Sequence, residues 1–195
     1  MKKTTKPSQN ALERLIKGNE RYVNNKSAHP NRSEERRKKI ASKQSPYAII
    51  VGCSDSRVSP EIIFDEGLGD LFIVRIAGNV IGPIELDSIE YSALHLNPSI
   101  ILVLGHENCG AVDAVMENKT ANIEMIAKLI EPAAKQARES KTDNPLELAI
   151  KTNALNMKDF LERSPNIEKL IKKNKIQVNA AYYNLKTGLV EILNK

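Results

Sequence analysis

Cysteine and tryptophan are scarce in this chain of 195 residues, which holds two cysteines, Cys53 and Cys109, and no tryptophan. Two cysteines are too few for the disulfide framework of a small secreted protein. No apolar run approaches the roughly 20 residues that cross a bilayer, and the basic start of the chain lacks the apolar stretch of a signal peptide. We therefore expect a cytoplasmic protein with no membrane partner, or a periplasmic one if a signal peptide has been removed.

Charge of neither sign dominates, since 29 Lys and Arg residues face 24 Asp and Glu residues, for a formal net charge of +5. The basic run at residues 36–39 is typical of a solvated helix face, because no aromatic side chains are interleaved there to stack on bases. With 41% hydrophobic and 27% charged residues, the chain has the composition of an ordinary globular domain. We expect no nucleic-acid partner.

Short apolar runs alternate with helical stretches from residue 46 onward. Residues 47–51, 71–74 and 100–104 are apolar throughout and rich in β-branched side chains, as strands buried on both faces of a parallel sheet are. Helical spacing separates these runs and continues after residue 110, and the chain ends in two predicted strands around a tight turn. This alternation predicts an α/β fold: one domain with a mostly parallel central β-sheet flanked by helices.

Residues 1–45 are expected to form an N-terminal helical arm, and residues 46–195 the α/β core of the same domain. Leu12 and Leu15 belong to an apolar face that recurs at helical spacing in the first predicted helix. A second helix is expected to start at Ser33, a good N-cap residue. The arm is therefore predicted to be helical but more polar than the core.

The scarce residues follow two of the predicted strands. Cys53 comes directly after the run YAIIVG, and His106 and Cys109 come after IILVLG in the order H-x-x-C. Because the carboxyl ends of parallel strands meet at one edge of a sheet, we expect the three side chains to converge. Thiolate and imidazole suit Zn²⁺, so the pattern predicts a zinc site. On these residues alone, a buried free thiol and a satisfied histidine remain the alternative.

Asp55 and Arg57 lie just after Cys53, close enough in sequence to form a charge-assisted pair. Two arrangements are open. Asp55 either takes the fourth ligand position, which closes the site, or pairs with Arg57 and accepts a hydrogen bond from a water on the metal, which leaves a catalytic site. Gly110, at a predicted helix N-terminus, offers a backbone N–H to a developing negative charge.

Two long segments carry a resemblance to a known family: CSDSRVSPEIIFDEGLGDLFIVRIAGNV at residues 53–80 and SIEYSALHLNPSIILVLGHENCGAV at residues 88–112. C-x-D-x-R followed by H-x-x-C at this separation is highly specific. The chain resembles the β-class carbonic anhydrases over most of its length. The resemblance implies a carbonate dehydratase, a lyase that reversibly hydrates carbon dioxide to bicarbonate and a proton by attack of zinc-bound hydroxide.

The resemblance also implies roles for individual residues. Residues 46–195 become a zinc-binding catalytic core with one Zn²⁺ per chain. The implied metal ligands are Cys53, His106 and Cys109, with Asp55 as a fourth ligand or as the group that orients the attacking water. The implied catalytic pair is Asp55 and Arg57. The implied substrate-binding residues are Gln44, Phe72, Ala77 and Tyr91. To these we add Gly110, for the backbone N–H that its place at a predicted helix N-terminus offers.

The family builds each pocket across a subunit interface, so the resemblance implies self-association as a dimer or tetramer. In such an assembly Gln44, Phe72 and Tyr91 would serve the zinc of a neighbouring subunit. We expect the apolar face of the first helix, with Leu12 and Leu15, to lie over that partner.

Two departures from the family pattern and two alternative functions stay open. Ile76 stands where the family usually has Asn, and Ile50 stands where members with an inhibitory bicarbonate site have Trp. The same fold and zinc would also serve a hydrolase of carbonyl sulfide or carbon disulfide, because both linear molecules have an electrophilic carbon. A non-catalytic zinc-stabilised domain would result if Asp55 closed the ligand shell.

Overall fold

Five strands form one sheet in the computed structural model, which describes residues 7–193; residues 1–6 of the expected arm lie outside the described part. The elements follow in the order α1 (Pro7–Val23), α2 (Glu34–Ile40), β1 (Ala48–Gly52), α3 (Pro60–Ile63), β2 (Leu71–Arg75), the 3₁₀ turn η1 (Ala77–Asn79), α4 (Pro83–His95), β3 (Ile100–His106), α5 (Gly110–Met116), α6 (Glu124–Arg138), α7 (Pro145–Arg163), α8 (Pro165–Lys172), β4 (Gln177–Tyr183) and β5 (Val190–Leu193).

The strand order is β2-β1-β3-β4-β5, with parallel pairing up to β4 and antiparallel pairing of β5 against β4. The prediction of a single α/β domain with a mostly parallel sheet is confirmed. Gly52, the last residue of β1, is level with Arg75 of β2 and Leu104 of β3. The carboxyl ends of these three strands therefore lie at one edge of the sheet.

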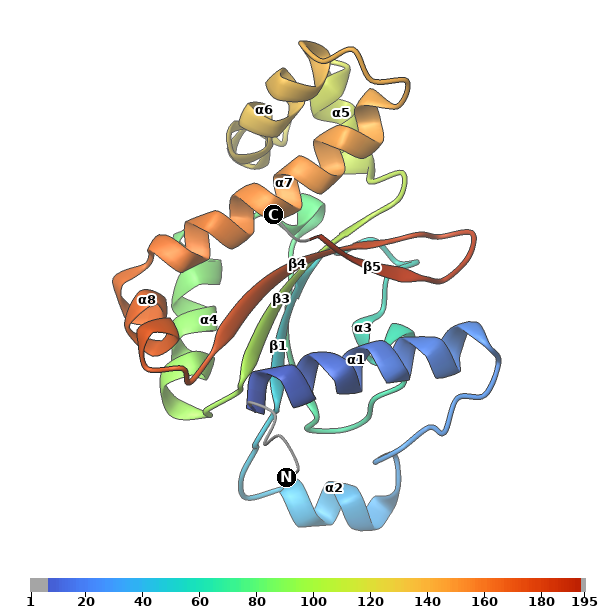
Figure 1. Ribbon diagram of the computed structural model, residues 1–195, viewed down its shortest axis with the longest axis vertical. Coiled ribbons are helices and arrows are strands. Elements are labelled where there is room, and N and C mark those ends of the chain that lie inside the picture. Colours follow the sequence, from blue (N-terminus) through green and yellow to red (C-terminus); the bar gives the residue numbers. More distant parts are fainter. Residues whose placement is uncertain (1–6, 194–195) are drawn as a thin grey trace, which may run out of the picture.

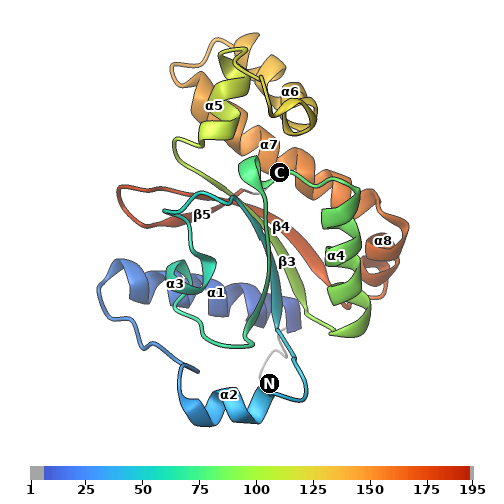
Figure 2. The same cartoon turned by 180° about the vertical axis from the view of Figure 1, so that it is seen from behind.

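Helices cover both faces of this sheet (Figure 1). Ile49 and Ile101 point into a core formed with α4 to α8, whereas Ile50 and Leu102 point into a second core formed with α1 and α3. All four side chains are fully buried. Figure 2 shows the molecule from behind, with α4 and α8 on the side away from α1. Burial on both faces explains why these strands are apolar without alternation.

The start of the second helix agrees with the sequence-based expectation. Ser33 caps α2 as predicted, since its hydroxyl accepts a hydrogen bond from the backbone N–H of Arg36. Asn144 caps α7 in the same way, since its side-chain oxygen accepts a hydrogen bond from the backbone N–H of Glu147. Pro145 follows the cap as the first residue of the helix. Among residues 7–193, no helix is both long and apolar enough to cross a membrane.

Helix α1 packs on the sheet of its own chain. Leu15 is fully buried and shares a core with Ile50 of β1, and Leu12 packs against the same core. A side chain without exposed surface has none left for a partner, so the prediction that this apolar face lies over a partner subunit is wrong for Leu15. For Leu12, which is only partly buried, it stays a prediction. The helical periodicity identified an apolar face, but it carries no information about which surface covers that face.

Two residues of α1 fix its distance from the rest of the chain. Gly18 lies so close to the backbone of Phe64 that a methyl group in place of its hydrogen would overlap the carbonyl oxygen. Asn19 is buried, and its amide donates to the carbonyl oxygens of Ile63, at 3.2 Å, and Gly188, at 2.8 Å. Helix α1 is thus held against α3 and the β4–β5 hairpin.

Replacement of Gly18 by Ala tests this close approach. Because the atom in the way belongs to the backbone and cannot rotate aside, we expect Gly18→Ala to lower the free energy of unfolding by roughly 2 to 3 kcal/mol. Equilibrium denaturation in urea measures the change. Glu20→Ala, at an exposed position of the same helix, should stay within about 0.5 kcal/mol of the native chain. Equal stability of the two variants would contradict the packing described.

Candidate metal centre

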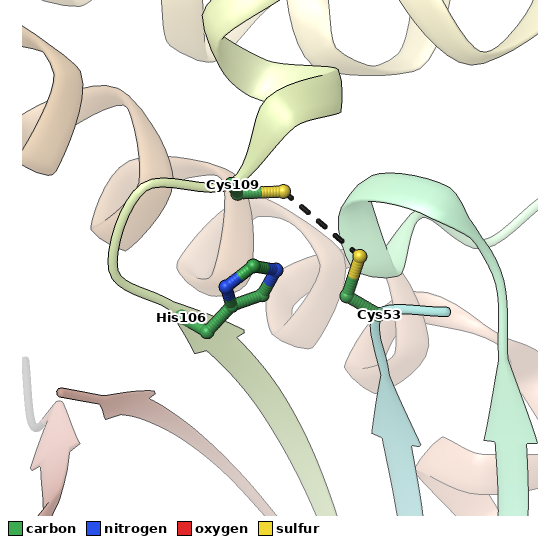
Figure 3. A group of neighbouring side chains, drawn as sticks. All are labelled: Cys53, His106 and Cys109. Carbon is green, nitrogen blue, oxygen red and sulfur yellow. Dashed lines mark hydrogen bonds between the residues drawn. The ribbon is translucent and has the colours of Figure 1, made fainter. Parts of the chain in front are cut away.

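Three potential metal ligands converge at the carboxyl edge of the sheet (Figure 3). Cys53 directly follows β1, His106 is the last residue of β3, and Cys109 is the N-cap of α5. Their ligand atoms all lie within 4.8 Å of one another, and the three residues are buried. The convergence predicted from the two strand ends is therefore present in one chain.

The imidazole of His106 is held in an orientation that suits a ligand. Its Nδ1 lies 2.9 Å from the carbonyl oxygen of Glu107, which fixes Nδ1 as the donor and leaves Nε2 with a lone pair. Nε2 is fully buried and has no hydrogen-bond partner among the described residues. Figure 3 shows a ring nitrogen facing the space between the two sulfurs. An unpartnered buried nitrogen beside two sulfurs fits a metal ligand.

The side chains of the two cysteines are hydrogen-bonded to each other. Their sulfurs are 4.0 Å apart, and the hydrogen bond from the Cys109 thiol lowers the pKa of Cys53 to about 4, whereas the same bond and burial raise the pKa of Cys109. Backbone N–H groups of Asp55, at 3.4 Å, and Gly78, at 3.3 Å, also donate to the Cys53 sulfur. These donors stabilise a thiolate, which is the form that binds metals.

The donor set fits a zinc-type metal ion. Two sulfurs bound at about 2.3 Å to one tetrahedral ion would be about 3.8 Å apart, close to the observed 4.0 Å. Two thiolates and one imidazole are soft to borderline ligands, the combination that suits zinc rather than magnesium or calcium. Three protein ligands leave a fourth coordination position, which is the arrangement of catalytic rather than structural sites.

Asp55 beside the cluster is paired with Arg57. The guanidinium donates from Nε to Oδ1 at 2.9 Å and from Nη2 to Oδ2 at 2.7 Å, and the Arg57 backbone N–H adds a bond to Oδ1 at 2.9 Å. These bonds hold the pKa of the Asp55 carboxyl far below its usual range. Oδ2 lies 3.9 Å from Nε2 of His106. Asp55 is thus ionised, engaged by Arg57 and adjacent to the metal ligands.

Arg75, at the end of β2, ties the loop of the first cysteine in place. Its Nε donates to the carbonyl oxygen of Cys53 at 2.8 Å, and its Nη2 donates to that of Asp55 at 2.7 Å. Ile76, which departs from the family pattern, acts here through its backbone, donating to Gly52 and accepting from Ser54. Sequence reasoning did not find the role of Arg75, because no spacing links it to carbonyl groups twenty residues away.

Glu107 is a second residue that sequence reasoning missed. Its carbonyl oxygen accepts a hydrogen bond from Nδ1 of the His106 ring. Its backbone N–H donates to the Tyr183 carbonyl oxygen at 2.8 Å, and its carboxylate accepts from the backbone N–H of Leu185 at 3.0 Å. Glu107 thereby fastens the second ligand loop to the β4–β5 hairpin. Its place inside H-x-x-C was the only available signal, and that motif does not assign a role to its middle positions.

One chain does not gather the predicted substrate-binding residues at the metal centre. Phe72 is level with Ile49 on the neighbouring strand β1. Ile49 precedes Cys53 by four residues, which corresponds to about 13 Å along a strand. Gln44 precedes β1 and so lies toward the other end of the sheet. Tyr91 on α4 is half exposed, and its ring contacts His95 rather than a metal ligand.

Ala77 and Gly110 are nearer to the ligands. Ala77 begins the turn η1, whose Gly78 donates to the Cys53 sulfur. Gly110 is the first residue of α5, directly after Cys109, and is exposed. The predicted pocket is therefore divided between residues beside the ligands and residues far from them in the same chain.

Comparison with known proteins gives a consistent picture. A family model described as carbonic anhydrase matches residues 48–190. Over 106 residues the chain is 52% identical to carbonic anhydrase 2 of Mycobacterium tuberculosis, a match that covers 54% of this chain and 51% of that protein. The Coccomyxa β-carbonic anhydrase in complex with acetazolamide superimposes with a TM-score of 0.73 at 26% identity, covering 95% of this chain and 86% of the other. One of two tetrameric β-carbonic anhydrases of Sordaria macrospora superimposes with a TM-score of 0.74 at 20% identity, and the match covers 95% of this chain and 98% of the other.

The fold and the residue cluster define an α/β protein with a Cys–His–Cys cluster that could hold a metal ion, at the edge of a mostly parallel sheet. The family match covers most of the chain, and the chain belongs to the β-carbonic anhydrase family. The chain spans about half the length of the mycobacterial relative.

Removal of single ligands tests the metal centre with Co²⁺, whose charge-transfer absorption reports bound thiolate. We expect one Co²⁺ per reduced chain, and we expect Cys109→Ser and His106→Ala each to weaken binding more than about 100-fold, beyond the 10- to 100-fold typical of groups that only orient a ligand. His95→Ala, which removes a histidine outside the cluster, should bind normally. Equal affinity of the ligand variants and the native chain would contradict the assignment.

Proposed function

We propose that the chain is a cytoplasmic zinc enzyme that reversibly hydrates carbon dioxide to bicarbonate and a proton. The observation that supports this most directly is the three-ligand Cys53–His106–Cys109 cluster beside an Asp55 carboxylate that is already engaged by Arg57. That engagement favours an open fourth coordination position over a closed structural site. Family membership supports the same reaction.

Zinc held by this cluster would acidify a water toward neutral pKa and so provide the nucleophile that carbon dioxide requires. The remaining work falls to residues of the chain. Asp55 is kept ionised by Arg57 and lies next to His106, so its carboxylate accepts a hydrogen bond from the attacking water and orients the water's lone pair toward the substrate carbon.

Two neighbouring groups would contact the substrate. The Gly110 N–H belongs to the first turn of α5, where backbone donors lack partners inside the helix, so it is available to a negative charge developing on a substrate oxygen. The methyl group of Ala77 contributes apolar surface, which suits a substrate without net charge. Arg57 is half exposed, so the Asp55–Arg57 pair borders the solvent that receives the released proton.

Completion of the pocket requires a second copy of the chain in this proposal. Phe72 lies on β2, one of the two edge strands of the sheet, and edge strands are usually covered. The neighbouring helix α4 exposes Ile84, Tyr91 and Leu94, with 81%, 51% and 44% of their surface accessible. Apolar exposure beside an open sheet edge is typical of an association surface. A self-association that brings Gln44, Phe72 and Tyr91 to a neighbouring zinc accounts for their distance from the ligands of their own chain.

Stopped-flow hydration of carbon dioxide, on protein of measured zinc content, tests the proposed reaction. We expect turnover from the native chain with one zinc per chain, and we expect Arg57→Ala to keep its zinc while losing roughly 10- to 100-fold in turnover, because Asp55 loses the group that holds it off the metal. Arg37→Ala, an exposed arginine of α2, is the matched control and should leave turnover unchanged.

The same assay separates the alternatives. Turnover of carbonyl sulfide or carbon disulfide without turnover of carbon dioxide would replace the proposed substrate. Bound zinc without turnover of any of these molecules would identify a non-catalytic zinc-stabilised domain. Full activity of Arg57→Ala would refute the role given to the pair of Asp55 and Arg57.

A subunit-complementation experiment tests the shared pocket. We expect Cys109→Ala to be inactive for lack of metal and Tyr91→Ala to bind zinc with reduced turnover. When the two variants are co-expressed, a mixed pair has one intact zinc site facing one intact Tyr91, so activity should rise above the sum of the separate variants. Absence of that rise in mixed dimers isolated by two affinity tags, or a fully active monomer in sedimentation, would contradict the shared pocket.

A further inference from the structure

Asn153 lies in the middle of α7, outside every motif that the sequence singled out, and is fully buried. Its neighbours on the helix are buried apolar residues of the core that the sheet forms with α4 to α8, namely Ala149, Ile150 and Ala154. Burial of an amide in apolar surroundings is unfavourable unless the amide is hydrogen-bonded. The bond that Asn153 makes runs from its Nδ2 to the carbonyl oxygen of Gly78, at 2.8 Å.

Gly78 is one of the two residues, with Asp55, whose backbone N–H donates to the Cys53 sulfur. Its backbone N–H donates to the Cys53 sulfur at 3.3 Å, while its carbonyl oxygen accepts a hydrogen bond from Nδ2 of Asn153. These two groups belong to successive peptide planes that meet at the Gly78 Cα. The orientation of one plane is therefore coupled to that of the other through the two backbone dihedral angles of a single residue.

The conformation of Gly78 is one that few other residues adopt. Its φ is +71°, in the left-handed region, and a Cβ at this position would lie 2.7 Å from Ile130 Cδ1 and 3.3 Å from the Ala111 Cβ. Because glycine can adopt many backbone conformations, Gly78 stays in this one only if contacts with other residues hold it there. In the described chain, α6 packs on one side of η1 and Asn153 holds the carbonyl group. Figure 3 shows the segment after β2 arching beside Cys53.

We infer that Asn153 is a positioning residue for the metal centre: through Gly78 it aims a backbone N–H at the Cys53 sulfur. This inference rests on the proposed zinc function. A donor that stays on the sulfur stabilises the thiolate and reduces the electron density that it gives to a metal, so the bond affects both affinity and the electronic character of the centre. Asn153 itself touches neither metal nor substrate.

The test measures metal binding rather than catalysis. Zinc affinity by competition with a chelator and the thiolate-to-Co²⁺ charge-transfer band are recorded for the native chain, Asn153→Ala and Asn153→Leu. Alanine deletes the amide, whereas leucine keeps a similar shape and volume, has no polar group and suits the apolar surroundings of this position. We expect both variants to bind zinc 10- to 100-fold more weakly and to shift the charge-transfer band, since the freed Gly78 carbonyl allows the turn to reorient.

Asn179→Ala is the matched control, because Asn179 is also a buried asparagine, on β4, and is not bonded to the turn η1. It should leave zinc affinity within about threefold of the native value and the band unchanged. Unfolding curves of all variants show which are folded, and the leucine variant carries the test if the alanine variant does not fold.

Three results would overturn the inference while the proposed function stands. These are native affinity and an unshifted band in a folded Asn153 variant, equal weakening in Asn179→Ala, or weaker binding with an unchanged band, which is the signature of general core loosening. A native chain that binds no zinc would instead overturn the proposed function itself, and with it the inference.

Discussion

The parallel pairing of β1 with β3 is the constraint on which the metal centre depends. Cys53 follows one strand and His106 ends the other, so their relative position is set by the register that aligns Gly52 with Leu104. A slip of one residue would shift one ligand by about 3.3 Å and turn every side chain of that strand to the opposite face. Metal bonds of about 2.0 to 2.3 Å tolerate no such error. The two apolar cores that lock the register therefore also determine the ligand geometry.

The register brings the ligand loops together, but hydrogen bonds from outside the strands orient them. Arg75 holds the carbonyl groups of the first loop, and Glu107 ties the second loop to the β4–β5 hairpin. Both act on backbone atoms or on a neighbouring ring rather than on substrate. Each restrains a loop that would otherwise be free at a sheet edge, where side chains must be placed to within fractions of an ångström.

Much of this arrangement was predictable from the sequence, for a physical reason. Strands buried on both faces have few alternatives to being apolar throughout, and chemistry-bearing residues such as Cys53 and His106 are scarce enough to stand out at their ends. The Asp55–Arg57 pair was predictable because its members are nearly adjacent. The Glu107 and Asn153 bonds were not predictable, since they join segments far apart in sequence through contacts that exist only after folding. The prediction that a partner subunit covers the apolar face of α1 failed at Leu15 for the same reason.

In the proposed zinc centre, the ligand set itself would favour the arrangement in which Asp55 stays paired with Arg57. Two thiolates cancel the formal charge of a divalent ion, so a zinc bound by Cys53, Cys109 and neutral His106 attracts a further carboxylate less than an ion in an all-imidazole shell would. Arg57 keeps its full positive charge and offers two parallel hydrogen bonds, the geometry that binds carboxylates best. Oδ2 is nevertheless only 3.9 Å from His106 Nε2, so a small displacement separates the two states. In the proposed enzyme, the competition between a neutralised metal ion and a full cation for the Asp55 carboxylate would decide whether the fourth coordination position is open to water.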